Sequence, residues 1–415
     1  MLLLTILTLF LLAFVNYKLG GRALLYPPVV FCAMWAFDLF LVWAAKDFFY
    51  PMLPETLFIF LSGAFVFSVG CWVVILLPEL KFPAKPALRE SSNQIITLLV
   101  LIVAAGTPFF YRWLSGLVAA SGGTGAFLLL ARMSVVEEMG KSVAFIIFGT
   151  LIDLSFIIAL VAFYEREGHP KRALLAITLS LGMGILLGQK VGPLSLVVGL
   201  ICIDWIKTRR INWKFVTVML VIFVAATVTI EFYVHLGGDS LQDKMVPIFQ
   251  NFVLYASGGI VGFDRVVREP NIVPGINPIY VTYLRILRRL GGHVEIPEVA
   301  DFISIGPHSL TNNVYTMYWE YLFLGYFGAI LFTGLIGLLL TLIYKRALQG
   351  GRFCILLYAV LFRGVVFSPF TDYFLMAYFF LKVLVVSWLI YALPERWGEF
   401  KRLMGIAVKA ELVKG

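Results

Sequence analysis

Charged residues are scarce in this chain of 415 residues. Asp, Glu, Lys and Arg make up 14% of the sequence, against roughly 25% in a typical soluble domain, whereas hydrophobic residues make up 61%. This balance excludes an ordinary soluble globular domain and indicates an integral membrane protein.

Motifs for metal-assisted or hydrolytic chemistry are also missing. The sequence has no Asp-x-Asp pair of the kind that holds a divalent ion on a nucleotide sugar, no nucleotide-binding Gly-rich loop, no His-Glu-x-x-His and no Gly-x-Ser-x-Gly. We therefore expect no metal and no cofactor. If the chain stabilises an anionic leaving group such as a diphosphate, Arg and Lys side chains would have to supply the positive charge in place of a metal.

Cysteine is rare, and its positions fit neither a metal site nor a disulfide framework. The four cysteines, Cys32, Cys71, Cys202 and Cys354, all lie within apolar runs. We interpret them as small buried residues of membrane spans.

Long continuous apolar runs are the main feature that the sequence does have. Hydrocarbon cannot hydrogen-bond a backbone, so runs of about 20 residues predict helices. We expect an all-α, polytopic transmembrane helix bundle that forms a single domain over residues 1–415. It should have about eleven spans, at 1–15, 24–45, 57–77, 94–111, 143–163, 173–188, 193–206, 214–234, 317–344, 353–369 and 373–393.

Basic residues gather in alternate connections between these spans. By the positive-inside rule those connections are cytoplasmic, which places the N-terminus outside and the C-terminus inside. The first span lacks a preceding basic region and a following small-residue cleavage site, so we expect a retained helix. Topology and anionic lipid account for the net charge of +9 without nucleic acid.

Two segments on the expected outer side are too long to be turns. Residues 112–142 include LLLARMSVVEEMGK, which predicts an amphipathic helix at the outer interface. Residues 235–316, between the eighth and ninth spans, are predicted to form a large outer loop whose apolar residues argue against disorder.

Several cations lie on the outer side or inside a span, against the positive-inside pattern. Arg363 is the sharpest case, because it lies ~9 Å along its helix from the outer end, where an ionised side chain is costly and indicates function. A structural pair with Asp372, or snorkelling to the interface, is the alternative. Together these cations predict a receptor for a phosphate or diphosphate headgroup. They are Arg112, Arg132, Lys190, Arg265, Arg268, Arg285, Arg288, Arg289 and Arg363.

Lys190 and Arg132 each have a simpler interpretation as well. Lys190 stands in LLGQKVGPLS between two short apolar runs, which suggests broken helices that meet at a ligand site, or a plain outer hairpin. Arg132 could anchor its interfacial helix to lipid phosphate.

The stretch GPHSLTNNVYTMYWE, residues 306–320, gathers polar side chains just before a span. Helical spacing would place Asn313, Thr316 and Glu320 on one face, which must then line a cavity or pack on polar groups. His308 could exchange a proton near neutral pH, or could simply hydrogen-bond backbone. Asn313 and the asparagine before it could instead be an N-cap pair.

Three stretches carry a resemblance to a known family: LLYPPVVFCAMWAFDLFLVWAA, GFDRVVREPNIVPGINPIYVTYLRIL and, above all, NNVYTMYWEYLFLGYFGAILFTGLIGLLLTLIYKRA. They resemble the bacterial O-antigen polymerase (Wzy) family of oligosaccharide repeat-unit polymerases, in which an Asn-Val-Tyr-Thr run precedes the glycine-bearing start of a late span. Two departures stand out. Leu324 precedes Gly325 where the family often has an acidic residue, and Lys190 in GQK replaces the arginine of a Gly-Ser-Arg-like turn.

The resemblance implies a metal-independent glycosyltransferase of lipopolysaccharide biosynthesis. It would transfer a growing oligosaccharide from undecaprenyl diphosphate to a hydroxyl of a lipid-linked repeat unit, at the periplasmic face of the bacterial inner membrane. Its partners would be the lipid-linked donor and acceptor and membrane lipids. A chain-length regulator is left open, and no nucleic acid is expected.

Under this resemblance, the expected catalytic residues are Arg363 on a diphosphate and either His308 or Glu320 as the base. Arginine and lysine would hold diphosphate, while Asn, Tyr and Thr side chains would orient sugar hydroxyls or brace the site. The residues expected to bind substrate are Arg112, Arg132, Lys190, Arg265, Arg268, Arg285, Asn313, Tyr315, Thr316 and Asp372.

Three other functions remain open from the sequence. An O-antigen ligase-like transferase would use the same donor but a lipid A core as acceptor. A flippase or transporter of lipid-linked glycan would carry cations in both leaflets, yet only Lys382 lies deep in a span, where Asp38 or Asp153 could be its structural partner. A scaffold would leave Arg363 unexplained.

Overall fold

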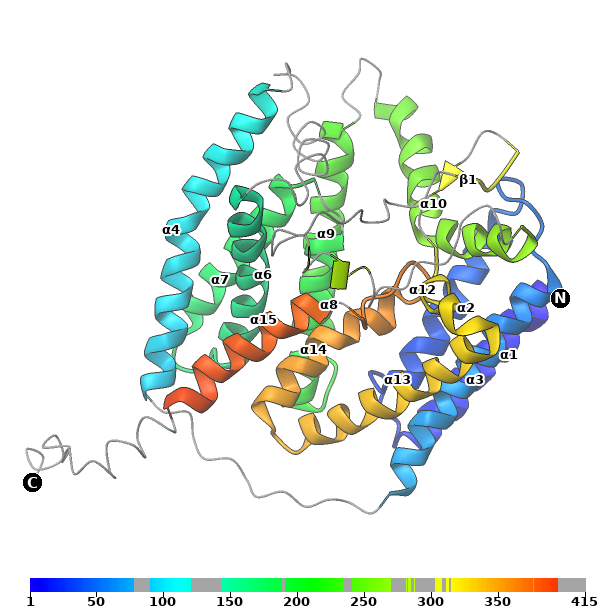
Figure 1. The fold of residues 1–415 in the computed structure, drawn as a ribbon, viewed down its shortest axis with the longest axis horizontal. Coiled ribbons are helices and arrows are strands. Elements are labelled where there is room, and N and C mark those ends of the chain that lie inside the picture. The colour runs from blue at the N-terminus through cyan, green and yellow to red at the C-terminus, as the bar shows by residue number, and fades with distance from the viewer. Residues whose placement is uncertain are drawn as a thin grey trace, which may run out of the picture. The chain divides into compact units, whose positions relative to one another are not determined.

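The computed structural model describes residues 1–77, 90–120, 143–188, 191–234, 241–269, 303–307, 311–312, 315–375 and 377–394, and single positions between 281 and 287. Helices dominate these ranges, and a helix lies over each predicted span (Figure 1). The helices are α1 (Leu2–Leu19), α2 (Pro27–Ala44), α3 (Pro54–Leu76), α4 (Glu90–Ala120), α6 (Val143–Tyr164), α7 (Pro170–Leu186), α8 (Val191–Thr208), α9 (Trp213–Val234), α10 (Leu241–Arg268), α12 (Met317–Tyr321), α13 (Gly325–Leu348), α14 (Arg352–Phe367) and α15 (Ala377–Ser387).

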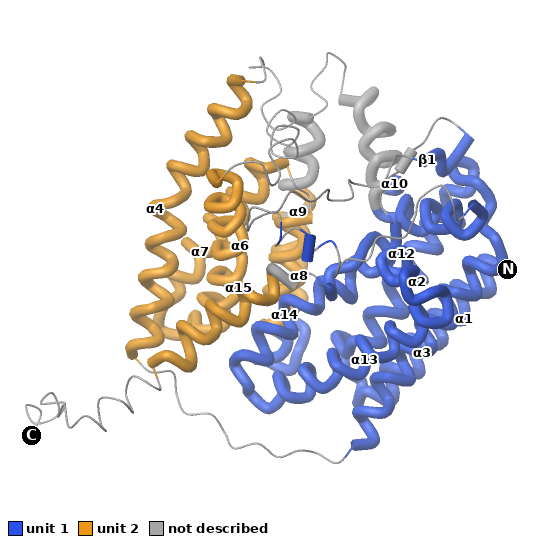
Figure 2. The backbone as a smooth tube through the Cα atoms, in the orientation of Figure 1, with its two compact units in different colours: residues 1–83, 205–211, 237–378 blue, residues 84–204, 212–236, 379–415 orange. Residues whose placement is uncertain are grey.

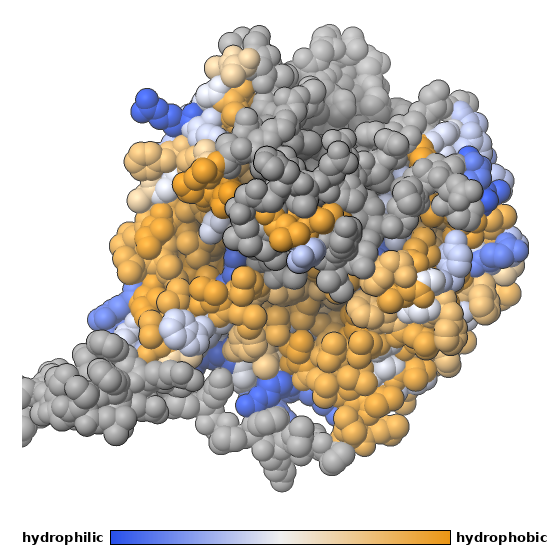
Figure 3. All heavy atoms as spheres, viewed as in Figure 1, coloured by the Kyte–Doolittle hydropathy of each residue, from blue (hydrophilic) through white to orange (hydrophobic). Residues whose placement is uncertain are grey.

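Seven helical segments in the described ranges are long and apolar enough to cross a membrane. They are α1, α2, α3, α4, α6, α8 and the segment Met317–Leu348, which contains α12 and α13. Large apolar side chains such as Leu4, Leu11 and Phe58 are exposed on these helices, and Figure 3 shows apolar surface over the described helices. The chain is therefore an all-α membrane protein with several spans. The full count of eleven and the orientation stay predictions.

Contacts divide the chain into two compact units, which are described separately (Figure 2). Unit 1 comprises residues 1–83, 205–211 and 237–378, and unit 2 comprises residues 84–204, 212–236 and 379–415. Unit 1 is thus built from segments far apart in the sequence. That the two units together form a single domain over residues 1–415 stays a prediction.

Helices α3 and α13 of unit 1 approach each other backbone to backbone. A Cβ atom on Gly70 would lie 2.0 Å from the carbonyl oxygen of Gly334, and one on Gly337 would lie 2.4 Å from the carbonyl oxygen of Phe67. The Thr333 hydroxyl also donates to the carbonyl of Gly63 at 3.3 Å. Small residues allow membrane helices to pack this closely, and dispersion and interhelical hydrogen bonds then hold them together.

An aromatic cluster fills the space beside this contact. The Trp35 ring on α2 lies 4.7 Å from Phe60 on α3 and 5.2 Å from Tyr318 on α12, between ring centroids. Phe263 on α10 lies 5.6 Å from Phe60. Tilted pairs at these distances add to the stabilisation from burial, so α2, α3, α10 and α12 share one core.

The predicted large loop contains regular structure that the sequence analysis did not foresee. Helix α10 occupies residues Leu241–Arg268, and two short antiparallel strands, β1 (Ile303–Ser304) and β2 (Thr311–Asn312), pair with Ile303 opposite Asn312. The loop therefore contributes a 28-residue helix to unit 1. Its periplasmic location stays a prediction.

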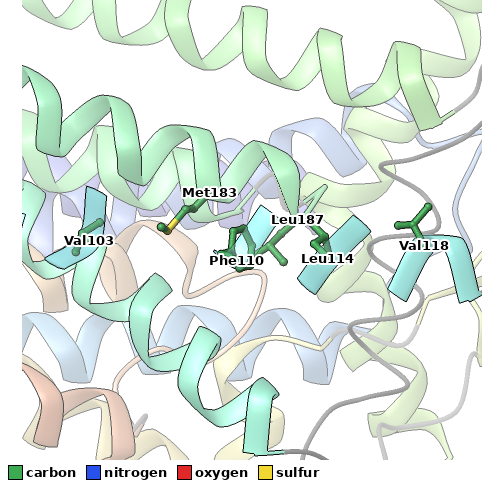
Figure 4. Packing of buried hydrophobic residues seen from close by; sticks show 6 residues of the cluster. All are labelled: Val103, Phe110, Leu114, Val118, Met183 and Leu187. Atoms are coloured by element: carbon green, nitrogen blue, oxygen red, sulfur yellow. The ribbon is translucent and has the colours of Figure 1, made fainter. Parts of the chain in front are cut away.

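Unit 2 has its own apolar core. Val103, Phe110, Leu114 and Val118 form one stripe of α4, and they pack with Met183 of α7 and Leu187 just after it (Figure 4). Spacings of four and seven residues place the α4 members on one face.

Two ion pairs also lie within unit 2. Lys382 of α15 pairs with Asp153 of α6, so of the two partners considered from the sequence the structure selects Asp153. Arg166 pairs with Asp204 at 2.7 Å. Burial of an ionised group is costly without such a partner, and the Lys382–Asp153 pair links α15 to α6.

Replacing Gly70 with alanine should weaken the α3–α13 contact, because the new methyl group would meet backbone that cannot rotate away. We expect a loss of about 1–3 kcal/mol in the free energy of unfolding, measured by thermal unfolding in detergent. Gly149→Ala in α6 is the matched control, since no atom lies within 4 Å of its added Cβ. Equal stability of the two variants would contradict the contact.

Candidate functional site

Two polar segments of unit 1 meet next to the aromatic cluster: residues 315–321 and the loop 368–375 between α14 and α15. The backbone N–H of Met317 donates to the carbonyl of Ser368 at 3.0 Å. The Trp35 indole N–H donates to the Ser368 hydroxyl, also at 3.0 Å. Ser368 thus joins the start of α12 and helix α2 to the loop.

Asp372 organises the rest of this loop. Its carboxylate accepts hydrogen bonds from the Tyr321 hydroxyl at 2.7 Å and from the backbone N–H groups of Phe374 and Leu375 at 2.9 and 3.0 Å. Burial raises the pKa of Asp372, and these three hydrogen bonds to the ionised form offset part of that rise. The side chain therefore shapes the loop, and its role as a substrate ligand stays a prediction.

Arg363 is buried one turn before the end of α14, with 7% of its surface exposed. Its guanidinium lies over the ring of Tyr373, 5.1 Å from the ring centroid, at cation–π distance. The Asp372 carboxylate accepts bonds from Tyr321, Phe374 and Leu375, and the pairing of Arg363 with Asp372 stays a prediction. A buried guanidinium is costly to desolvate, so Arg363 is a candidate functional residue.

Helix α10 covers the same loop. A Cβ on Gly259 would lie 2.8 Å from the Pro369 carbonyl oxygen and 2.9 Å from that of Phe370, so α10 rests directly on loop backbone. The Ser257 hydroxyl, half a turn earlier, donates to the backbone carbonyl of Asp38 on α2 at 3.4 Å.

Arg265 and Arg268, predicted to bind diphosphate, both have acidic neighbours at the end of α10. Arg268 Nε donates to the buried carboxylate of Asp264 at 2.8 Å, and Asp264 also accepts the Leu53 N–H at 2.8 Å. Arg265 pairs with Glu269 at 2.9 Å. These bonds attach α10 to the start of α3, and contacts of the two arginines with substrate stay predictions.

The helical face predicted from Asn313 through Thr316 to Glu320 is wrong. Helix α12 begins only at Met317, and Thr316 precedes it with extended backbone, φ −58° and ψ 168°. The alternative of an asparagine N-cap is wrong for the same reason, and Asn312 belongs to strand β2. The hydrophobic residues that follow the polar run are buried, so the chain enters the core in extended form before helix α12 begins.

The remaining members of this segment take different positions. Tyr315 and Thr316 are buried at 2% and 0% exposure, whereas Glu320 is half-buried on α12. The Thr316 hydroxyl is buried and makes no hydrogen bond within the described ranges. Thr316 therefore offers a polar group inside the core of unit 1.

The other predicted site residues lie in unit 2 or outside the described residues. Arg112 is exposed on α4 in unit 2. Residues 121–142, with the predicted amphipathic helix, lie outside the described residues. So do Arg132, Lys190, Arg285, Arg288, Arg289, His308 and Asn313. Within the described ranges, no three His, Cys, Asp or Glu side chains converge as metal ligands.

Three residues of this site were missed in the sequence analysis. Trp35 and Tyr321 were not singled out, and each donates a hydrogen bond to the loop. Asp38 was considered only as a partner for Lys382, yet it is a buried carboxyl three residues after Trp35, on the same face of α2. A buried acid in a membrane span was the available signal.

Comparison with protein-family models, curated proteins and solved structures finds no match to this chain.

Asp372 should make stability depend on pH in a defined direction. Because the pKa of Asp372 is raised in the folded chain, its contribution is present below about pH 4 and is lost as pH rises through the folded pKa. Asp372→Asn should therefore flatten the fall of Tm with rising pH in detergent. Exposed Asp47 supplies the control, since Asp47→Asn should keep the wild-type slope. A slope unchanged in Asp372→Asn would contradict this coupling.

Proposed function

We propose that the chain is a glycan polymerase that transfers a growing oligosaccharide from a polyprenyl diphosphate carrier to a hydroxyl of a lipid-linked repeat unit. The observation that carries the proposal is Arg363, a guanidinium buried near the end of the apolar helix α14, over the ring of Tyr373 and beside the loop 368–375. A diphosphate leaving group is the ligand chemistry that such a cation suits.

The reaction requires two groups at one place, one that stabilises negative charge on the leaving diphosphate and one that accepts the proton of the acceptor hydroxyl. The bond between the anomeric carbon and a diphosphate oxygen breaks, and a glycosidic bond to the acceptor oxygen forms. Arg363 would stabilise the negative charge on the departing diphosphate, while a base takes the proton of the acceptor hydroxyl. Glu320 or His308 would be that base, and the products are the lengthened glycan on its new carrier and free polyprenyl diphosphate.

The surroundings of Arg363 support this use. The loop 368–375 is held by Ser368, Asp372 and Gly259, so its backbone next to the arginine is preorganised. Preorganised groups stabilise developing charge more effectively than groups that must rearrange. The Asn-Val-Tyr-Thr run that carries the resemblance to O-antigen polymerases ends in Tyr315 and Thr316, directly before Met317, which bonds this loop.

In this proposal the protein lies in the bacterial inner membrane with the Arg363 end of α14 at the periplasmic side. Donor and acceptor are both lipid-linked, and the step belongs to lipopolysaccharide biosynthesis. Ligation of the glycan to a lipid A core would use the same donor chemistry, so the acceptor must be decided by experiment.

Arg363→Ala should abolish polymerisation. We expect a strain that lacks its own polymerase and supplies a matching repeat unit to show a glycan ladder with the wild-type chain and a single repeat unit with this variant. Loss of a group that stabilises the leaving charge costs about 10²–10³ in rate. Arg363→Lys should restore only part of the ladder, because lysine keeps the charge but loses the bidentate geometry. His308→Ala tests the base.

Arg352→Ala is the matched control, because Arg352 begins the same helix at its opposite end. Its ladder should equal that of the wild type at equal membrane levels. An unchanged ladder in Arg363→Ala would remove the proposed role of this residue. A wild-type chain that attaches glycan to lipid A core without lengthening it would replace the polymerase by a ligase.

A further inference from the structure

A second polar site lies at the opposite end of α13, away from the loop 368–375. A cavity of about 440 Å³ opens there between the turn that joins α1 to α2, the end of α3 and the end of α13. We call it the basic pocket. Lys345 and Arg346 of α13 line it, together with Tyr26, Gln349 and the backbone of Gly20 and Gly21.

Four described segments at the basic pocket carry charge of a single sign. The segments 14–26, 68–77, 205–211 and 338–352 contain eight Lys and Arg residues and no Asp or Glu. These segments meet in unit 1, since the Trp205 ring stacks on Tyr344 at 5.8 Å and Arg209 donates to the carbonyl of Leu348. Such a field attracts anions.

The cations are held in place by backbone contacts. Lys345 Nζ donates to the Val74 carbonyl at 2.5 Å, which fixes the ammonium at the pocket wall. Arg22 and Arg209, in the connections next to the pocket, have φ values of 64° and 57° and are the two non-glycine residues with positive φ in the described ranges. Residues other than glycine seldom adopt this strained backbone conformation, and such strain often occurs in functional segments.

Apolar side chains form the rest of the lining. Leu19, Leu77 and Leu342 are lining residues with exposed surface. A free phosphate ion would gain nothing from these leucines, whereas a lipid would place its headgroup on the cations and its chains along the leucines.

We propose that the basic pocket binds the phosphate of an anionic phospholipid headgroup. The positive-inside rule explains why cations gather on one side of the membrane. It does not explain their convergence on a cavity whose described lining residues include no carboxylate. The ligand chemistry is a phosphodiester with net negative charge, contacted by Lys345 and Arg346, and the site is independent of the proposed polymerase reaction.

The test measures lipid retention by native mass spectrometry of the purified full chain released from detergent, with phosphatidylglycerol or phosphatidylcholine added. We expect phosphatidylglycerol to be retained in preference to phosphatidylcholine, and Lys345→Gln/Arg346→Gln to weaken its binding about tenfold or more. Arg210→Gln is the matched control, because Arg210 is an exposed cation of the segment 205–211 and does not line the pocket.

Two further arms decide the remaining outcomes. Millimolar inorganic phosphate should fail to displace the lipid, and displacement would show a free-anion site instead. A photoactivatable phosphatidylglycerol should label the wild-type chain at residues 338–352 or 14–26, which tests the site even where the double variant does not fold. Labelling elsewhere, or equal retention by the double variant and the Arg210→Gln control, would overturn the proposal.

Discussion

The backbone contact between α3 and α13 is the interaction on which the rest of unit 1 depends. Gly70, Gly334 and Gly337 bring the two helices together, and Gly63 makes room for the Tyr318 hydroxyl, since a Cβ there would lie 1.8 Å from it. Tyr318 in turn packs on Trp35, whose indole bonds the loop 368–375. The position of the candidate site thus follows from the absence of four side-chain methyl groups.

Burial away from water explains the form of that site. Buried polar groups are expensive unless they are hydrogen-bonded, and in the loop 368–375 Ser368 and Asp372 bond to backbone and to aromatic side chains. Unit 1 carries buried or pocket-lining cations in two separate places, Arg363 near the end of α14 and Lys345 with Arg346 in the last turn of α13.

Local sequence was sufficient for the helices that lie over the predicted spans, but not for α10 or for the packing partners of each helix. Apolar runs predicted those helices because hydropathy is read within one segment. The Trp35–Ser368 bond joins residues 333 positions apart, and no local pattern indicates it. Thr316 was misassigned because helical spacing was extended across a stretch that is buried in extended form. For Lys382 the sequence left Asp38 and Asp153 open as partners, and the structure selects Asp153.

Unit 1 is discontinuous, and this has a consequence for biogenesis. A ribosome delivers α1, α2 and α3 to the membrane long before it synthesises α13 and α14, and all of unit 2 up to α9 is made in between. During that interval the glycine face of α3 around Gly70 has no native partner and contacts lipid or the insertion machinery. Unit 1 is therefore completed late, after its first helices have been inserted. A ribosome that stalls before α13 leaves α1, α2 and α3 without their native partners, as a substrate for membrane quality control.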